Sequence, residues 1–101
     1  MIIAVDYDGT LEINKTMNMA LISTLKGKQK KGDVIILWTC RQGQRLIEAL
    51  NNLKKAGFVP NLVNENAPWT IKSFGYNPRK IFADIYIDDK FFDIDMLKQI
   101  I

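Results

Sequence analysis

Three apolar runs constrain the fold of this chain more than any other feature of its sequence. They cover residues 2–5, 34–38 and 85–87, and each is rich in β-branched or aromatic residues and is followed by polar ones. The runs are continuous rather than alternating, which is typical of strands in a sheet covered on both faces. The sequence therefore predicts a buried parallel sheet within an α/β domain.

Amphipathic segments follow the first two runs. Apolar residues recur at every fourth position over 17–25, which predicts a helix with Asn14 or Thr16 as its N-cap and an end near Gly32. A second apolar stripe over 46–53 predicts another helix. Strands and helices that alternate in this way indicate a single doubly wound, Rossmann-like parallel sheet with right-handed crossovers.

The rest of the chain is less regular. Gly57 is expected to stop the second helix, and residues 58–63 could form a short strand that Pro60 confines to an edge. Residues 64–79 are expected to form a loop with one turn of helix near Ile71, and the last residues, from 92 on, a closing helix. At 101 residues the chain has room for one domain, 1–101.

Composition excludes several kinds of chemistry. The chain has no histidine, so histidine acid–base catalysis, a serine–histidine triad and the usual zinc sites are ruled out. A single cysteine, Cys40, allows no internal disulfide, and neither a leader nor a membrane-spanning apolar segment is evident. A cytoplasmic location without membrane contact is therefore expected.

A lysine cluster at 26–31 accounts for much of the net charge of +3. Such a cluster could bind nucleic acid, but it lies at the end of a predicted helix, where cations complement the helix dipole. No aromatic residue is interleaved with it for base stacking. Nucleic acid is therefore not the expected partner.

Acidic residues follow two of the three predicted strands. Asp6 and Asp8 end the first, and Asp88 and Asp89 end the last, while Thr39 ends the second. Ligands of open parallel sheets bind outside the carboxyl ends of the strands, and carboxylates gathered there cannot all stay ionised without a cation. Ligands that are all oxygen favour Mg²⁺ over zinc or copper.

Each of these features also has a purely structural interpretation. Asp-x-Asp-Gly-Thr could be a tight turn in which the glycine supplies an unusual φ, and Asp88 and Asp89 could cap a following helix. Thr39 could simply end a strand, and Lys80 could be a solvated surface charge. It is the combination of all four features, in this order, that favours a functional site.

That combination resembles a known family. The stretches "IIAVDYDGTL", "VIILWTCR" and "RKIFADIYIDDK" are similar, in order and over nearly the whole chain, to the four motifs of the haloacid dehalogenase (HAD) superfamily of phosphatases. The last stretch resembles small bacterial and phage hydrolases of that superfamily and the metal-binding motif of its deoxyribonucleotidases. The resemblance implies a HAD-like fold and a magnesium-dependent phosphatase that acts on a phosphomonoester.

The resemblance also implies roles for the acidic residues. Asp6 is expected to be the nucleophile that forms an aspartyl-phosphate and also a metal ligand, and Asp8 the general acid and base, with its backbone carbonyl also on the metal. Asp88 is expected to bind Mg²⁺ directly, and Asp89 to support the metal through water or a neighbouring group. Such a mechanism splits one hard displacement into two easier ones.

Phosphate-binding residues follow from the same resemblance. Thr39 is expected to bind the phosphate, and Lys80, eight residues before Asp88, to stabilise its charge, although Lys72 lies in the same region. Arg41 could orient a phosphate or substrate carboxylate, or could pair with a surface acid. Cys40 is expected to be a small buried or half-buried residue beside them.

A loop past the third predicted strand supplies further candidates for contact with the substrate. Asn64, Glu65, Asn66 and Trp69 could touch the leaving group. It is equally plausible that the asparagines make turns and that Trp69 covers the core.

No cap domain fits between the motifs. Only 30 residues separate Asp8 from Thr39, and 40 separate Thr39 from Lys80. An open site would accept a phosphorylated small molecule or a phosphate exposed on a larger substrate, or would borrow a lid from a second protomer of a homo-oligomer. Two other functions remain open: a phospho-acceptor signalling domain and a catalytically silent binding module.

Overall fold

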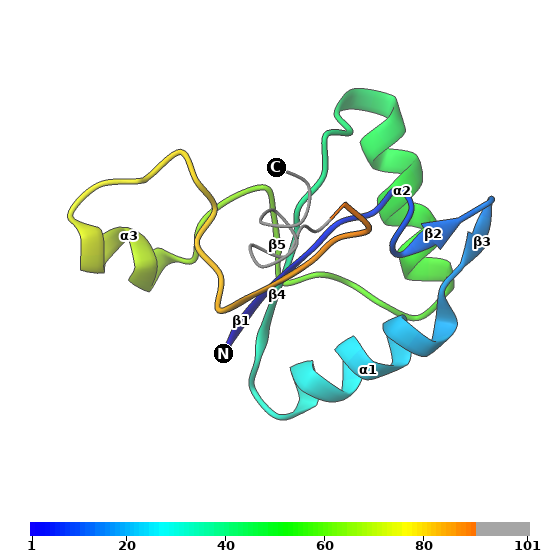
Figure 1. Ribbon diagram of the computed structural model, residues 1–101, viewed down its shortest axis with the longest axis horizontal. Helices are drawn as coiled ribbons and strands as arrows, with labels where there is room; N and C mark the ends of the chain where they lie inside the picture. Colours follow the sequence, from blue (N-terminus) through cyan, green and yellow to red (C-terminus); the bar gives the residue numbers. More distant parts are fainter. Residues whose placement is uncertain (91–101) are drawn as a thin grey trace, which may run out of the picture.

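The computed structural model describes residues 1–90, and a parallel sheet of four strands lies at the centre of this region (Figure 1). The strand order is β5-β4-β1-β6, with β1 (Ile2–Val5) between β4 (Val34–Leu37) and β6 (Ile85–Ile87). β5 (Leu62–Val63) pairs with the outer side of β4. The three predicted strands are confirmed, and all of them run parallel.

Helices lie on both sides of the sheet. Helices α1 (Met19–Lys30) and α2 (Gly43–Lys55) lie on one side, next to a small hairpin of β2 (Glu12–Ile13) and β3 (Thr16–Met17) (Figure 1). The short helix α3 (Pro68–Phe74) lies on the other side. This layered α/β arrangement is compatible with a Rossmann-like fold.

The main core fills the space between the sheet and α1 and α2. Ile3 and Val5 of β1 point into it, since alternate residues of a strand face the same side. They pack against Leu25 of α1 and Leu53 of α2, both buried. A second cluster on the opposite face includes Ala4, and it explains why the strand sequence is apolar at every position.

The first helix is confirmed, but its predicted cap is wrong. Its N-cap is Asn18, whose Oδ1 accepts a hydrogen bond from the Leu21 N–H at 3.2 Å. Asn14 instead lies with Lys15 in the turn between β2 and β3, where φ is +50° and +63°. Positive φ at both positions is the geometry of a two-residue hairpin turn, so this segment enters a hairpin before the helix begins.

The irregular region follows the prediction in part. Gly57 follows the end of α2 with φ +85°, but only the last two residues of the segment 58–63 form a strand. The single turn expected near Ile71 is a helix of seven residues, α3. The expected closing helix from residue 92 on lies outside the described residues. Within residues 1–90, no helix is long and apolar enough to cross a membrane.

Candidate active site

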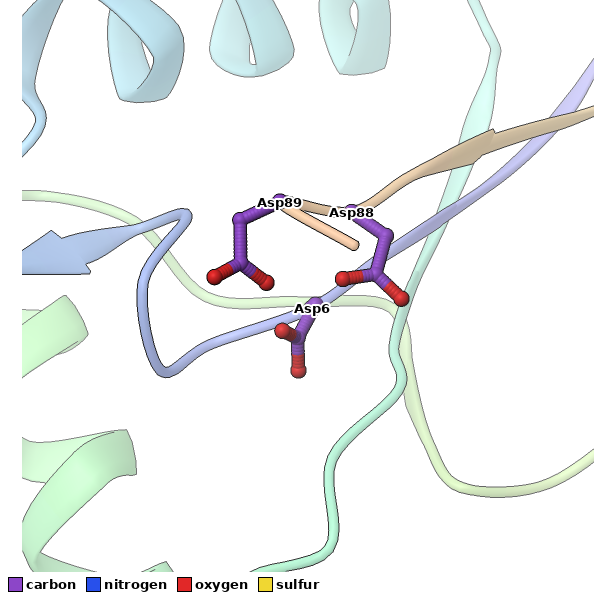
Figure 2. Close-up of side chains that lie close together, drawn as sticks. All are labelled: Asp6, Asp88 and Asp89. Carbon is purple, nitrogen blue, oxygen red and sulfur yellow. The ribbon is translucent and has the colours of Figure 1, made fainter. Parts of the chain in front are cut away.

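Three carboxylates converge at the carboxyl edge of the sheet. Asp6 follows β1, while Asp88 and Asp89 follow β6, its parallel neighbour. The Asp6 N–H donates to the Ile87 carbonyl at 2.9 Å, which extends the β1–β6 pairing up to the site. One oxygen of each carboxylate lies within 4.8 Å of the others, as Figure 2 illustrates. The ends of β1 and β6 therefore lie close together, as predicted from the sequence.

The electrostatics of the cluster are uneven. Burial raises the pKa of Asp6, and the negative charges of Asp88, Asp89 and Asp8 raise it further, against a hydrogen bond from the Tyr7 backbone that lowers it. The pKa of Asp89 is lowered, chiefly by the Lys90 ammonium, whose Nζ lies 3.2 Å from Asp89 Oδ2. A bound cation would relieve the repulsion that Asp6 experiences.

Gly9 allows the close approach of Asp89. Its φ is +80°, and a Cβ added at this position would overlap the Asp89 carboxylate, lying 2.9 Å from Cγ. A side chain at position 9 would therefore push Asp89 out of the cluster. The glycine has the unusual φ expected of it, and it also serves the site directly.

Asn64 fixes Thr39 at the end of β4. Its Oδ1 accepts from the Thr39 N–H and its Nδ2 donates to the Thr39 carbonyl, both at 2.8 Å. The Thr39 hydroxyl accepts a hydrogen bond from the Arg41 N–H at 3.1 Å and keeps its own proton to donate. Asn64 thus holds the residue expected to bind phosphate.

Asp8 does not join the other three carboxylates but pairs with Arg41. The Arg41 Nε donates to Asp8 Oδ2 at 2.9 Å, and Nη2 donates to Asp8 Oδ1 at 2.7 Å. This bidentate contact lowers the pKa of Asp8. Of the two interpretations open for Arg41, the structure therefore shows the pair with an acid.

A cleft of about 730 Å³ joins these groups. Its walls include the acidic residues, the end of β4 and two cations that were not predicted from the sequence, Arg79 and Lys90. The lining residues are Asp6, Asp8, Gly9, Trp38, Thr39, Cys40, Asn64, Arg79, Ile81, Asp88, Asp89 and Lys90.

Neither lysine considered for the phosphate lines this cleft. Lys80 Nζ lies over the ring of Tyr86, 5.6 Å from its centroid, and Lys72 lies on α3. Arg79 lies next to Lys80 in the sequence "RK", and this second cation was a signal that could have been used. Which of the two side chains faces the cleft depends on the path of the loop.

Other expected residues have different roles. Cys40 is exposed, so the expectation of a buried or half-buried thiol is wrong. Asn66 is buried and fixes the loop: its Oδ1 accepts from the Phe82 N–H at 2.7 Å. Trp69 is 55% exposed and does not cover the core. The cleft is lined by none of the three other loop candidates, Glu65, Asn66 and Trp69.

Carboxylate oxygens at this spacing suit a hard divalent cation. Asp6, Asp88 and Asp89 are the residues that could hold Mg²⁺, which binds one or two carboxylates and keeps water in its other positions. The raised pKa of Asp6 fits such a role, because burial and, after it, the neighbouring acids make the charged form costly when no cation is bound.

Comparison with known proteins identifies one informative relative. No protein-family model and no curated protein match the chain. A solved structure of a conserved protein from Bacteroides thetaiotaomicron matches with a TM-score of 0.72 and 30% sequence identity. The match covers 99% of this chain and 88% of that chain. The chain therefore belongs to the same family as this conserved Bacteroides thetaiotaomicron protein.

Proposed function

We propose that this protein is a magnesium-dependent phosphatase of the capless HAD type, which hydrolyses a phosphomonoester through an aspartyl-phosphate on Asp6. The observation that carries the proposal is the convergence of Asp6, Asp88 and Asp89 at the carboxyl ends of neighbouring parallel strands. The order of the sequence motifs supports it, and so does the position of Thr39 in the same cleft.

In the first step, an Asp6 carboxylate oxygen attacks phosphorus. The bond from phosphorus to the leaving oxygen breaks, and Asp8 donates a proton to that oxygen. Asp8 has to be protonated for this step, so its contact with Arg41, which lowers its pKa, has to open first. In the second step, water attacks phosphorus and gives its proton to Asp8, and the bond to Asp6 breaks to release inorganic phosphate. When bound, Mg²⁺ would screen the negative charge of Asp6 from that of the phosphate.

Phosphate oxygens need donors and positive charge during both steps. The Thr39 hydroxyl can donate, since its own hydrogen bond with Arg41 uses it only as an acceptor. Arg79 and Lys90 line the cleft and add positive charge to it. Lys80 would have to leave the Tyr86 ring to take part, which a flexible lysine side chain can do.

We propose a phosphorylated small molecule, or a phosphate exposed on a larger substrate, as the partner. The segment from Asp8 to Thr39 contains the β2–β3 hairpin and α1, and the segment from Thr39 to Lys80 contains α2, β5 and α3. None of these elements is a separate domain, which fits a capless enzyme with an accessible cleft. A cytosolic location is part of this proposal, and a single cysteine, which allows no internal disulfide, fits it.

Phosphate release from 4-nitrophenyl phosphate tests the function. Wild type should turn over with Mg²⁺, lose activity with a chelator and regain it with added Mg²⁺. Asp6→Asn should abolish turnover, while Glu48→Asn on the exposed face of α2 should not. Equal turnover by wild type and Asp6→Asn would refute the assignment of Asp6 as the nucleophile. A stable phosphoprotein without turnover would favour the signalling function instead.

A further inference from the structure

Arg41 is a largely buried guanidinium whose contacts exceed what one ion pair requires. Its side chain is 11% exposed, whereas that of its partner Asp8 is 54% exposed. Its Cζ lies 4.7 Å from the centre of the Tyr7 ring, and its Nη1 donates to the Arg45 carbonyl at 3.2 Å. The guanidinium is thus held by an aromatic face and a helix backbone, independently of Asp8.

A second carboxylate lies beside this guanidinium. Glu12 Oε2 is 3.6 Å from Arg41 Nη2, beyond hydrogen-bond distance for this pair. The same oxygen is buried, and within residues 1–90 it meets the distance and angle of no hydrogen bond. The Tyr7 hydroxyl lies near the Glu12 carboxylate, which adds to the effect of burial in raising the pKa of Tyr7, but it does not satisfy this oxygen by those criteria. A buried carboxylate oxygen without a partner is costly, so a small movement of Arg41 toward Glu12 would be favourable for Glu12.

We propose that Arg41 is a positioning residue that exchanges between Asp8 and Glu12, and so frees one Asp8 oxygen to face the leaving group. The inference rests on the proposed function, because it concerns the residue that carries the proton. In the observed arrangement, both oxygens of Asp8 accept hydrogen bonds from Arg41. The Tyr7 ring allows the guanidinium to shift without losing its cation–π contact.

Location supports the exchange. Glu12 begins strand β2 of the hairpin that directly follows Asp8, and the Gly9 N–H donates to the Glu12 carbonyl at 2.8 Å. A shift of Arg41 toward Glu12 therefore stays within one hydrogen-bonded loop and leaves the metal cluster in place. Glu12 is then the alternative partner of Arg41, and the new contact with Glu12 compensates for the hydrogen bond that Arg41 loses with Asp8.

Leaving-group dependence tests the inference. General acid catalysis strongly affects an alkyl phosphate, because an alkoxide leaves slowly unless it is protonated. It has little effect on 4-nitrophenyl phosphate, whose leaving group needs no proton. In Glu12→Gln, Arg41 should stay on Asp8, so the single-turnover rate at which glycerol 3-phosphate phosphorylates Asp6 should fall about tenfold or more. The same rate with 4-nitrophenyl phosphate, read from the burst of 4-nitrophenol, should change by less than about twofold. Glu48→Gln is the matched control and should alter neither substrate.

Arg41→Lys provides a second variant, since lysine keeps the charge but cannot hold both Asp8 oxygens in a fork. It too should change the ratio of alkyl to aryl turnover. Equal losses for the two substrates, in step with a lower melting temperature, would mean that Arg41 and Glu12 only support the structure and would overturn the inference.

A measurement without substrate separates this inference from the proposed function. Relaxation dispersion of the Arg41 side-chain ¹⁵Nε in the free protein should show two-state exchange in wild type and none in Glu12→Gln. Flat profiles in both proteins would overturn the exchange even if the protein is a phosphatase. An inactive wild type would instead refute the proposed function, and the relaxation profiles would still decide whether Arg41 exchanges between Asp8 and Glu12.

Discussion

Substitution of Gly9 by alanine should weaken the metal site while leaving the fold intact. Alanine at φ +80° costs about 1–2 kcal/mol of stability. Its Cβ would also overlap the carboxylate of Asp89. That side chain is 31% exposed and can rotate away, so the overlap should cost little stability but should remove one oxygen ligand.

Gly75→Ala is a matched control for this experiment. Gly75 has the same φ of +80°, and a Cβ added there meets nothing within 4 Å. Both variants should therefore lose about 1–2 kcal/mol in a metal-free urea titration. Only Gly9→Ala should lose affinity for Mg²⁺.

Thermal unfolding with and without Mg²⁺ measures this difference. At a concentration 100 times the wild-type Kd, the metal should stabilise wild type and Gly75→Ala by about 2.7 kcal/mol. A tenfold weaker site in Gly9→Ala would reduce that stabilisation to about 1.4 kcal/mol. Equal stabilisation of all three proteins would refute the argument that Gly9 makes room for Asp89 at a metal.

Two further perturbations test other parts of the account. Asn64→Ala removes both hydrogen bonds to Thr39 and should cost about 2 kcal/mol more in urea unfolding than Asn14→Ala, an exposed turn position with nearly the same φ, +50° against +51°; equal midpoints would contradict the role of Asn64. Asp6 has a pKa raised above its ordinary value of 3.8, so its contribution to metal-free stability is lost as the pH rises through that value to the raised one. With a chelator present, Asp6→Asn should thus gain stability relative to wild type as the pH rises above 3.8, and a difference independent of pH would contradict the raised pKa.

The main strands could be predicted because burial on two faces makes them apolar throughout. The short strand β5 was harder to delimit, since side chains replace part of its backbone pairing. The Asn61 side-chain oxygen accepts the hydrogen bond of the Ile35 N–H at 2.8 Å, so regular pairing begins only at Leu62. Asn18 was missed as a helix cap because Asn14 and Thr16 offered equally good capping side chains.

The acidic cluster could be predicted because parallel neighbours bring their carboxyl ends to one edge. The side of the cleft that Arg79 lines could not be predicted from the sequence. The path of that loop depends on the Tyr86 hydroxyl, which donates to the Ile81 carbonyl at 2.6 Å, and on buried Asn66. These contacts follow no sequence period, and neither does the pairing of Asp8 with Arg41.

A phosphoryl group on Asp6 during turnover would be direct evidence that this carboxylate is the nucleophile. Wild type mixed with Mg²⁺ and 4-nitrophenyl phosphate should be quenched in acid, digested and examined by mass spectrometry. We expect a phosphoryl group on the peptide that contains Asp6, formed and lost as fast as phosphate is released and absent in Asp6→Asn. Phosphate release without any phosphorylated Asp6, or at an equal rate in Asp6→Asn, would contradict it.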